Sequence, residues 1–144
     1  MNLRPLHVDK VESDMPILTV KIAGRRSDRM TDEVAAMLTE HTVRILDKKP
    51  EVTAIAISYV DPRDWIVAGR SLESQGKSSF AVEIKVTDET NSKDQKRQYI
   101  QAVFEGFGKI LGDLHEESYI HVHDVRAAAY GYGGLTQEFR YQHP

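Results

Sequence analysis

The chain has 144 residues, of which 40% are hydrophobic and 28% are charged, a balance typical of one folded domain and not of a disordered segment. It contains no cysteine, which excludes disulfides, thiolate catalysis and cysteine-ligated metal centres. The formal net charge is −3 and no basic stripe is visible, so we expect no nucleic-acid partner.

Residues 1–15 form a polar lead-in that carries charges where a signal peptide would have its apolar stretch. No apolar run elsewhere is long enough to span a membrane. We therefore expect a cytoplasmic protein without a membrane partner. We expect an N-terminal extension over residues 1–15, followed by one domain over residues 16–144.

A strand, a helix and a second strand are predicted after this extension. Residues 17–22 are rich in β-branched side chains and predict a strand, and residues 24–28 predict a turn with helix-start chemistry. Apolar residues then recur at steps of three and four over residues 30–45, which predicts an amphipathic helix that Pro50 is expected to end. Residues 52–60 are an almost continuous apolar run, typical of a strand covered on both faces.

The same order of elements returns in the second half. Residues 80–86 predict a strand. Ser92 and Gln95 form a capping box at the start of a helix whose apolar stripe covers residues 99–111. Residues 118–123 predict the returning strand.

Corresponding elements are about 64 residues apart, which indicates an internal duplication. We assign repeat one to residues 16–72 and repeat two to residues 79–140, and each ends in a short hairpin segment, at 65–69 and 130–134. Two strand–helix–strand units with right-handed crossovers predict an α+β fold in which a four-stranded sheet carries both helices on one face. Because no third helix is predicted for the other face, we expect an oligomer that covers it.

Residues 15–28 read Met-Pro-Ile-Leu-Thr-Val-Lys-Ile-Ala-Gly-Arg-Arg-Ser-Asp and resemble the start of the 4-oxalocrotonate tautomerase family. Those proteins begin with a proline exposed by removal of methionine, followed by a short strand and a Gly-Arg-Ser-Asp turn. Their arginine lies ten residues after the proline, which corresponds to Arg26 counted from Pro16. Trp65 and residues 130–134 match the aromatic and glycine-rich hairpin of the family.

The duplication makes the chain similar to the fused branch of this family, which includes malonate semialdehyde decarboxylase and the 3-chloroacrylic acid dehalogenases. The resemblance implies a homotrimer with its sheets facing inward, a small carboxylate substrate, no cofactor and no metal. It also implies that Pro16 is the general base and that Arg26 binds the carboxylate or enolate. Trp65 would form a dry pocket wall, and Arg25 or Arg70 are further substrate-binding candidates.

Two departures from the family pattern matter for activity. Pro16 follows Met15 in this sequence, and an acylated proline nitrogen is an amide that cannot accept a proton. We therefore expect a tautomerase or isomerase of small enol or 2-oxo acids if the mature chain begins at Pro16, and an inactive chain if it begins at Met1. The arginine on the second strand of the family unit is also absent, and Arg25, Arg63 or Arg70 are its possible replacements.

Other functions stay open at this point. A decarboxylase or hydratase of the same branch is the alternative enzyme, although residues 88–91 are acidic and neutral where decarboxylase-like members carry two arginines. Asp124 is a candidate for orienting water in a hydration. A trimeric scaffold with Pro16 blocked by residues 1–15 is the non-catalytic alternative. His121 and His123 could reach one metal from the same strand face, but packing is the favoured interpretation.

Overall fold

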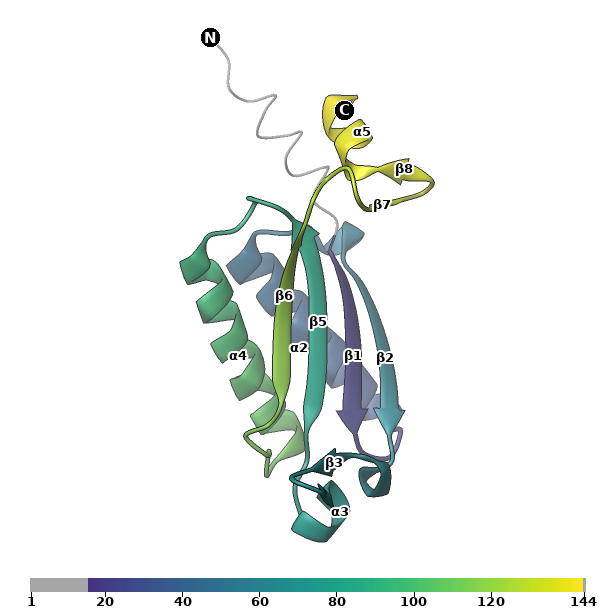
Figure 1. Ribbon diagram of the computed structural model, residues 1–144, viewed down its shortest axis with the longest axis vertical. Coiled ribbons are helices and arrows are strands. Elements are labelled where there is room, and N and C mark those ends of the chain that lie inside the picture. Colours follow the sequence, from purple (N-terminus) through teal and green to yellow (C-terminus); the bar gives the residue numbers. More distant parts are fainter. Residues whose placement is uncertain (1–15, 144) are drawn as a thin grey trace.

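The computed structural model describes residues 16–143 and contains one four-stranded sheet with two long helices on one of its faces (Figure 1). This arrangement confirms the predicted α+β fold of two strand–helix–strand repeats. The strand order is β2-β1-β5-β6. The elements of repeat one are β1 (Ile17–Ala23), α2 (Asp28–Leu46) and β2 (Ala54–Val60), and those of repeat two are β5 (Phe80–Thr87), α4 (Lys93–Leu111) and β6 (Tyr119–Val125).

Within each repeat the two strands are parallel, whereas the two repeats join through antiparallel β1 and β5. Ile17 at the start of β1 therefore pairs with Lys85 near the end of β5, and Ile22 pairs with Phe80 at its start. This pairing gives the sheet two unlike ends along the strand direction. We call the end with the starts of β1 and β2 the proline end, and the opposite end, where β1 and β2 finish, the arginine end.

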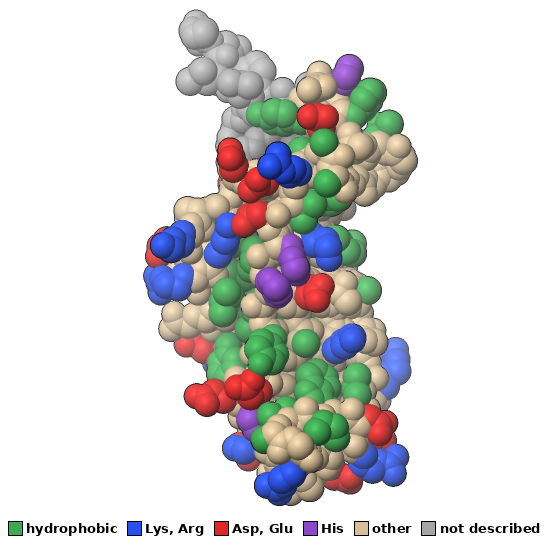
Figure 2. Space-filling view, viewed as in Figure 1, with side chains coloured by type: hydrophobic (Ala, Val, Ile, Leu, Met, Phe, Trp, Pro, Cys, Tyr) green, Lys and Arg blue, Asp and Glu red, His purple; other side chains and the backbone are tan. Residues whose placement is uncertain are grey.

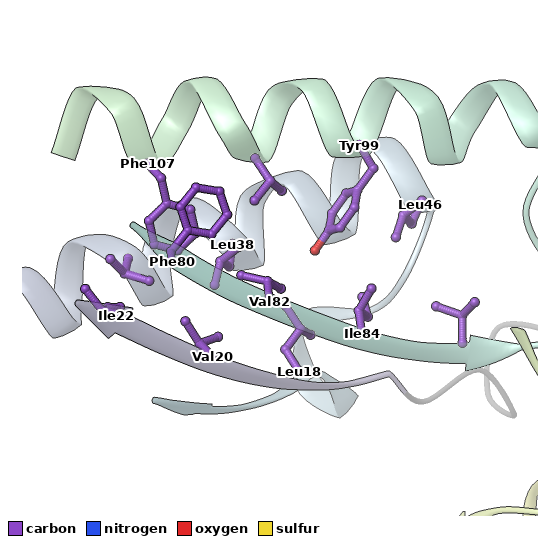
Figure 3. Packing of buried hydrophobic residues seen from close by; sticks show 13 residues of the cluster. Leu18, Val20, Ile22, Leu38, Leu46, Phe80, Val82, Ile84, Tyr99 and Phe107 are labelled. Carbon is purple, nitrogen blue, oxygen red and sulfur yellow. The ribbon is translucent and has the colours of Figure 1, made fainter. Parts of the chain in front are cut away.

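The core lies between the sheet and the two helices, where alternate residues of β1 and β5 are buried. Phe80 of β5 stacks on Phe107 of α4 with 3.9 Å between ring centroids, and Figure 3 shows both rings above the sheet. The hydroxyl groups of Thr42 on α2 and Tyr99 on α4 lie 2.9 Å apart and are buried. The two helices are thus joined to each other as well as to the sheet.

Each repeat ends in the same hairpin and short helix. In repeat one these are β3 (Ile66–Val67), β4 (Arg70–Ser71) and α3 (Leu72–Gln75), and in repeat two they are β7 (Gly131–Tyr132), β8 (Leu135–Thr136) and α5 (Gln137–Gln142). Leu72 N–H donates to the Trp65 carbonyl (2.9 Å), and Gln137 N–H donates to the Tyr130 carbonyl (2.8 Å). These matching bonds show that the hairpins correspond one to one. Figure 1 places them beyond opposite ends of the strands.

The sheet face turned away from α2 and α4 is open in a single chain, and we call it the open face. On β2 its side chains are the small residues Ala54, Ala56 and Ser58, all exposed. Figure 2 shows this face, where histidine, acidic and basic side chains lie among hydrophobic ones. The expectation that residues 52–60 are covered on both faces is therefore wrong for one chain, because β2 is an edge strand with one bare face.

Two boundaries differ from expectation. Helix α2 ends at Leu46, before Pro50, because Asp47 takes a left-handed conformation and its N–H donates to the Thr42 carbonyl, five residues earlier, which breaks the regular helical pattern. Pro50 begins a 3-10 turn, Pro50–Val52, and a second such turn, Pro62–Asp64, follows β2. The extension of residues 1–15 lies outside the described residues, and the predicted domain boundaries stay predictions. None of the described helices combines the length and the apolar character that a membrane span requires.

Candidate active site

Pro16 lies at the proline end, immediately before β1, and is buried. Its carbonyl accepts a hydrogen bond from Ala54 N–H at 3.2 Å, which fixes the start of β1 against β2. The residue borders a cavity of about 270 Å³, large enough for a small organic acid. The cavity is lined mainly by apolar and aromatic groups, namely Pro16, Ile17, Val52, Ala54, Tyr130, Gly131 and Tyr132.

The hairpin of repeat two forms the outer wall of this cavity and is held at both tyrosines. Tyr130 OH lies 2.8 Å from the Thr87 hydroxyl at the end of β5. Arg140 of α5 donates to the Tyr132 carbonyl at 3.0 Å, and its guanidinium lies 3.7 Å from the centre of the Tyr132 ring. The Arg140 Nε is buried and has no hydrogen-bond partner among the described residues. Arg140 is therefore a cation beside the Pro16 cavity.

Arg26 lies at the arginine end, beyond the far end of β1. Strand β1 and then Gly24 and Arg25 lie between it and Pro16, and the seven residues of β1 alone span about 23 Å at 3.3 Å per residue. Arg26 pairs with Asp28 at 2.5 Å in an exposed position, and this hydrogen bond raises the pKa of its guanidinium. Within one chain, Arg26 and Pro16 do not share a site.

A wider cavity of about 650 Å³ surrounds the arginines at this end. It is lined by Gly24, Arg25, Arg26, Tyr59, Asp61, Pro62, Arg63 and Glu73. Arg63 holds Asp61 through its guanidinium at 2.8 Å and through its backbone N–H at 2.9 Å, and these bonds lower the pKa of Asp61 to about 2. Arg25 forms no hydrogen bond among the residues that the structure describes, so it is the freest guanidinium in this cavity.

The structure places the remaining predicted substrate residues at the arginine end as well. Trp65 is half-buried just before β3, and Arg70 on β4 donates weakly to the Ser74 carbonyl at 3.5 Å. Neither residue lines the Pro16 cavity. One chain therefore gathers Arg25, Arg26, Trp65 and Arg70 at one end and leaves Pro16 at the other.

Sequence reasoning named the hairpin at residues 130–134 but missed Arg140. The position of Arg140 could have been predicted in part from the duplication, because antiparallel pairing of the two repeats brings the end of repeat two beside the start of repeat one. By the same pairing, the loop after β5, with Asp88, Glu89 and Thr90, lies at the proline end. Lys85, which is opposite Ile17 in the register, is a further cation near this end.

The histidines and Asp124 take packing and pairing roles in the described structure. His121 and His123 stack on the open face with 3.9 Å between ring centroids, and His123 Nε2 lies 3.9 Å from a Glu83 carboxylate oxygen. The described residues hold no cluster of three groups suited to a metal. Asp124 pairs with Lys96 of α4 at 2.5 Å and so faces the helix layer, not a cavity.

His41 is half-buried on α2, with its Nδ1 3.0 Å from an Arg44 nitrogen. Burial and, less strongly, the Arg44 charge lower the pKa of His41. It is thus a packed histidine remote from both cavities.

Comparison with known proteins finds a family model and several solved structures that resemble this chain. Residues 16–75 match the family model described as tautomerase enzyme. An asymmetric trimer of wild-type fused 4-OT superposes with a TM-score of 0.73 at 17% identity, covering 85% of this chain and 97% of the other. Native fused 4-OT gives 0.71 at 20% identity, with coverages of 85% and 97%. FG41 malonate semialdehyde decarboxylase inhibited by 3-bromopropiolate gives 0.68 at 16% identity, with coverages of 89% and 97%. No curated protein matches the chain.

Proposed function

We propose that this chain is a tautomerase of small enol or 2-oxo carboxylic acids, because residues 16–75 match the tautomerase family model and the chain shares the fold of fused 4-OT. The observation that carries this proposal is the position of Pro16 in an apolar cavity walled by Tyr130 and Tyr132. The active form is the one in which Pro16 is the first residue.

The proline ring supplies the base in this proposal. A free secondary amine accepts a proton, whereas the amide nitrogen formed with Met15 does not. The mainly apolar and aromatic lining of the Pro16 cavity would disfavour the charged form of such an amine, which favours its action as a base. The nitrogen takes the proton from the enol oxygen as the carbonyl forms. It then returns the proton to the other carbon of the former double bond, the one that does not become the carbonyl carbon. No atom is gained or lost, so the reaction is an isomerisation.

Positive charge near the cavity would bind the carboxylate and stabilise the enolate. Within one chain, Arg140 is a guanidinium beside this cavity, and its buried Nε has no hydrogen-bond partner among the described residues. We propose that Arg25 and Arg26, with Trp65 and Arg70, act only if a second copy brings its arginine end to the proline end of the first.

A homotrimer is part of this proposal. The open face leaves Ile17 and Tyr119 exposed at 38% and 62%, and no described helix covers it. Fused 4-OT is a trimer and shares the fold at low identity. Burial of this face between copies would remove apolar surface from water and define the walls of each cavity.

A decarboxylase is the second candidate, favoured by the likeness to malonate semialdehyde decarboxylase. Against it, the loop at the proline end offers Asp88 and Glu89 where a dianionic substrate would require cations. A chain that keeps residues 1–15 has no free secondary amine at Pro16, and for that form we propose a non-catalytic trimeric scaffold.

The test is an assay of the protein produced from Met15, with the methionine removed, on phenylpyruvate and 2-hydroxymuconate. We expect enol–keto conversion that Pro16→Ala reduces at least about a hundredfold, the range of general-base catalysis. Malonate semialdehyde and 3-haloacrylates serve as decarboxylase and hydratase substrates in parallel. A pure chain that begins at Pro16 and converts none of the enol substrates contradicts the proposal.

A further inference from the structure

A second pocket opens at the proline end, between the loop after β5 and helix α5. Its volume is about 340 Å³, and its walls include Asp88, Glu89 and Thr90 from the loop with Gln137 and Tyr141 from α5. The hydroxyl pair of Thr87 and Tyr130 stands between this pocket, which Thr87 lines, and the Pro16 cavity, which Tyr130 lines. We call it the Gln137 pocket.

Gln137 is the feature that marks this pocket as a binding site. The residue is 0% exposed, and neither its Nε2 nor its Oε1 has a hydrogen-bond partner among the described residues. A buried amide without partners is unfavourable, since both groups lose their bonds to water. The amide therefore has an NH2 donor group and an oxygen acceptor without partners beside the pocket that Gln137 lines.

The duplication supplies an internal comparison for Gln137. At the corresponding position of repeat one, Leu72 is also 0% exposed, and both residues donate their N–H to the carbonyl that opens the hairpin. The backbone setting is thus the same in the two repeats. Leucine fills this position well in repeat one, so the fold does not require an amide in repeat two.

The loops after β1 and β5, which line the two corresponding pockets, carry opposite charges. The loop after β1 brings Arg25 and Arg26 to its cavity, whereas the loop after β5 brings Asp88 and Glu89 to the Gln137 pocket. Thr90, which also lines the pocket, accepts a hydrogen bond from the buried Lys48 ammonium at 3.1 Å, so one cation borders the pocket beside its two carboxylates. Both carboxylates of the Gln137 pocket are exposed and favour a positive ligand group.

We propose that the Gln137 pocket binds a small molecule that carries a primary carboxamide and an ammonium group. The carboxamide pairs with the Gln137 side chain, each amide donating one N–H to the oxygen of the other. The ammonium lies against Asp88 and Glu89. This binding does not depend on the state of the Pro16 nitrogen, so it is separate from the proposed tautomerase reaction.

The proposal is tested by isothermal titration calorimetry, in which leucinamide is added to the full chain and the heat of binding is measured. We expect leucinamide to bind, and both leucine and N-acetylleucinamide to bind at least about tenfold more weakly, since the first lacks the carboxamide and the second lacks the charge. Gln137→Leu gives repeat two the residue that repeat one has at the corresponding position, and it should weaken leucinamide binding at least about tenfold. Gln137→Met, which keeps the side-chain length, should do the same.

Variants of the nearby carboxylates and a measurement of thermal stability serve as controls. Glu89→Gln should weaken leucinamide binding, whereas Glu138→Gln, on α5 but outside the pocket lining, should leave it unchanged. Gln137→Leu should raise the melting temperature, because it removes an unpartnered buried amide. Equal affinity of the wild type and both Gln137 variants, equal affinity for leucinamide and leucine, or no leucinamide binding at millimolar concentration would each overturn the proposal.

Discussion

The buried hydroxyl pair between α2 and α4 makes a quantitative prediction about alkaline stability. Burial raises the pKa of Tyr99 to about 12, and the hydrogen bond with Thr42 opposes this only in part. In the unfolded chain a tyrosine titrates near 10, so the unfolded state loses its proton first as the pH rises. The stability linked to Tyr99 is complete below pH 10 and is lost between about pH 10 and 12. Two pKa units correspond to about 3 kcal/mol at most.

Tyr99→Phe removes the titrating group and should flatten this part of the stability profile. At pH 7 the variant should be less stable by about 1–3 kcal/mol, because Thr42 keeps a buried hydroxyl without its partner. Urea unfolding followed by circular dichroism between pH 7 and 11 measures both effects, and Tyr141→Phe on the exposed α5 surface is the control. The double variant with Thr42→Val should cost less than the sum of the single changes. A Tyr99→Phe chain that loses stability above pH 10 as steeply as the wild type would refute the reasoning.

Three further predictions concern the proposed site, each in the chain that begins at Pro16. Arg140→Met should raise KM for the acid substrate about tenfold, as expected for loss of a charge-assisted hydrogen bond, with kcat measured in the same assay. Gly131→Ala should open the hairpin and abolish activity while the helical circular dichroism persists, because a Cβ there would lie 1.9 Å from the Leu135 carbonyl oxygen. A 1:1 mixture of Pro16→Ala and Arg26→Ala chains, unfolded and refolded together, should regain about one quarter of wild-type activity if Arg26 acts across subunits of a closed ring; no regain would remove Arg26 from the site.

Local patterns in the sequence predicted the elements of the fold well. The capping box of Ser92 and Gln95 has both of its hydrogen bonds, and the alternation in β5 places every second side chain in the core. These features depend on neighbours in the chain, so periodicity and capping chemistry are sufficient to find them. The end of α2 was missed because the left-handed turn at Asp47, not the proline, determines it.

The site was harder to predict because it depends on pairing between distant strands. Counting from Pro16 to Arg26 identifies a family pattern, but it does not reveal that β1 holds the two residues at opposite ends of the sheet. The antiparallel joining of β1 and β5 instead brings Arg140, Glu89 and Gln137 to the proline end. No local signal marks these residues, since an arginine or glutamine in a short C-terminal helix is ordinarily a surface residue.

The most direct test of the account is the protonation state of the Pro16 nitrogen in the chain that begins at that residue. A titration by ¹⁵N nuclear magnetic resonance, with the tautomerase rate measured over the same pH range, should give one shared pKa below the ordinary α-amino range of about 7.7–8.0. The chain that retains residues 1–15 should show neither the titration nor the rate. Equal tautomerase activity in the two chains, or a rate that does not follow the titration of this nitrogen, would contradict the account.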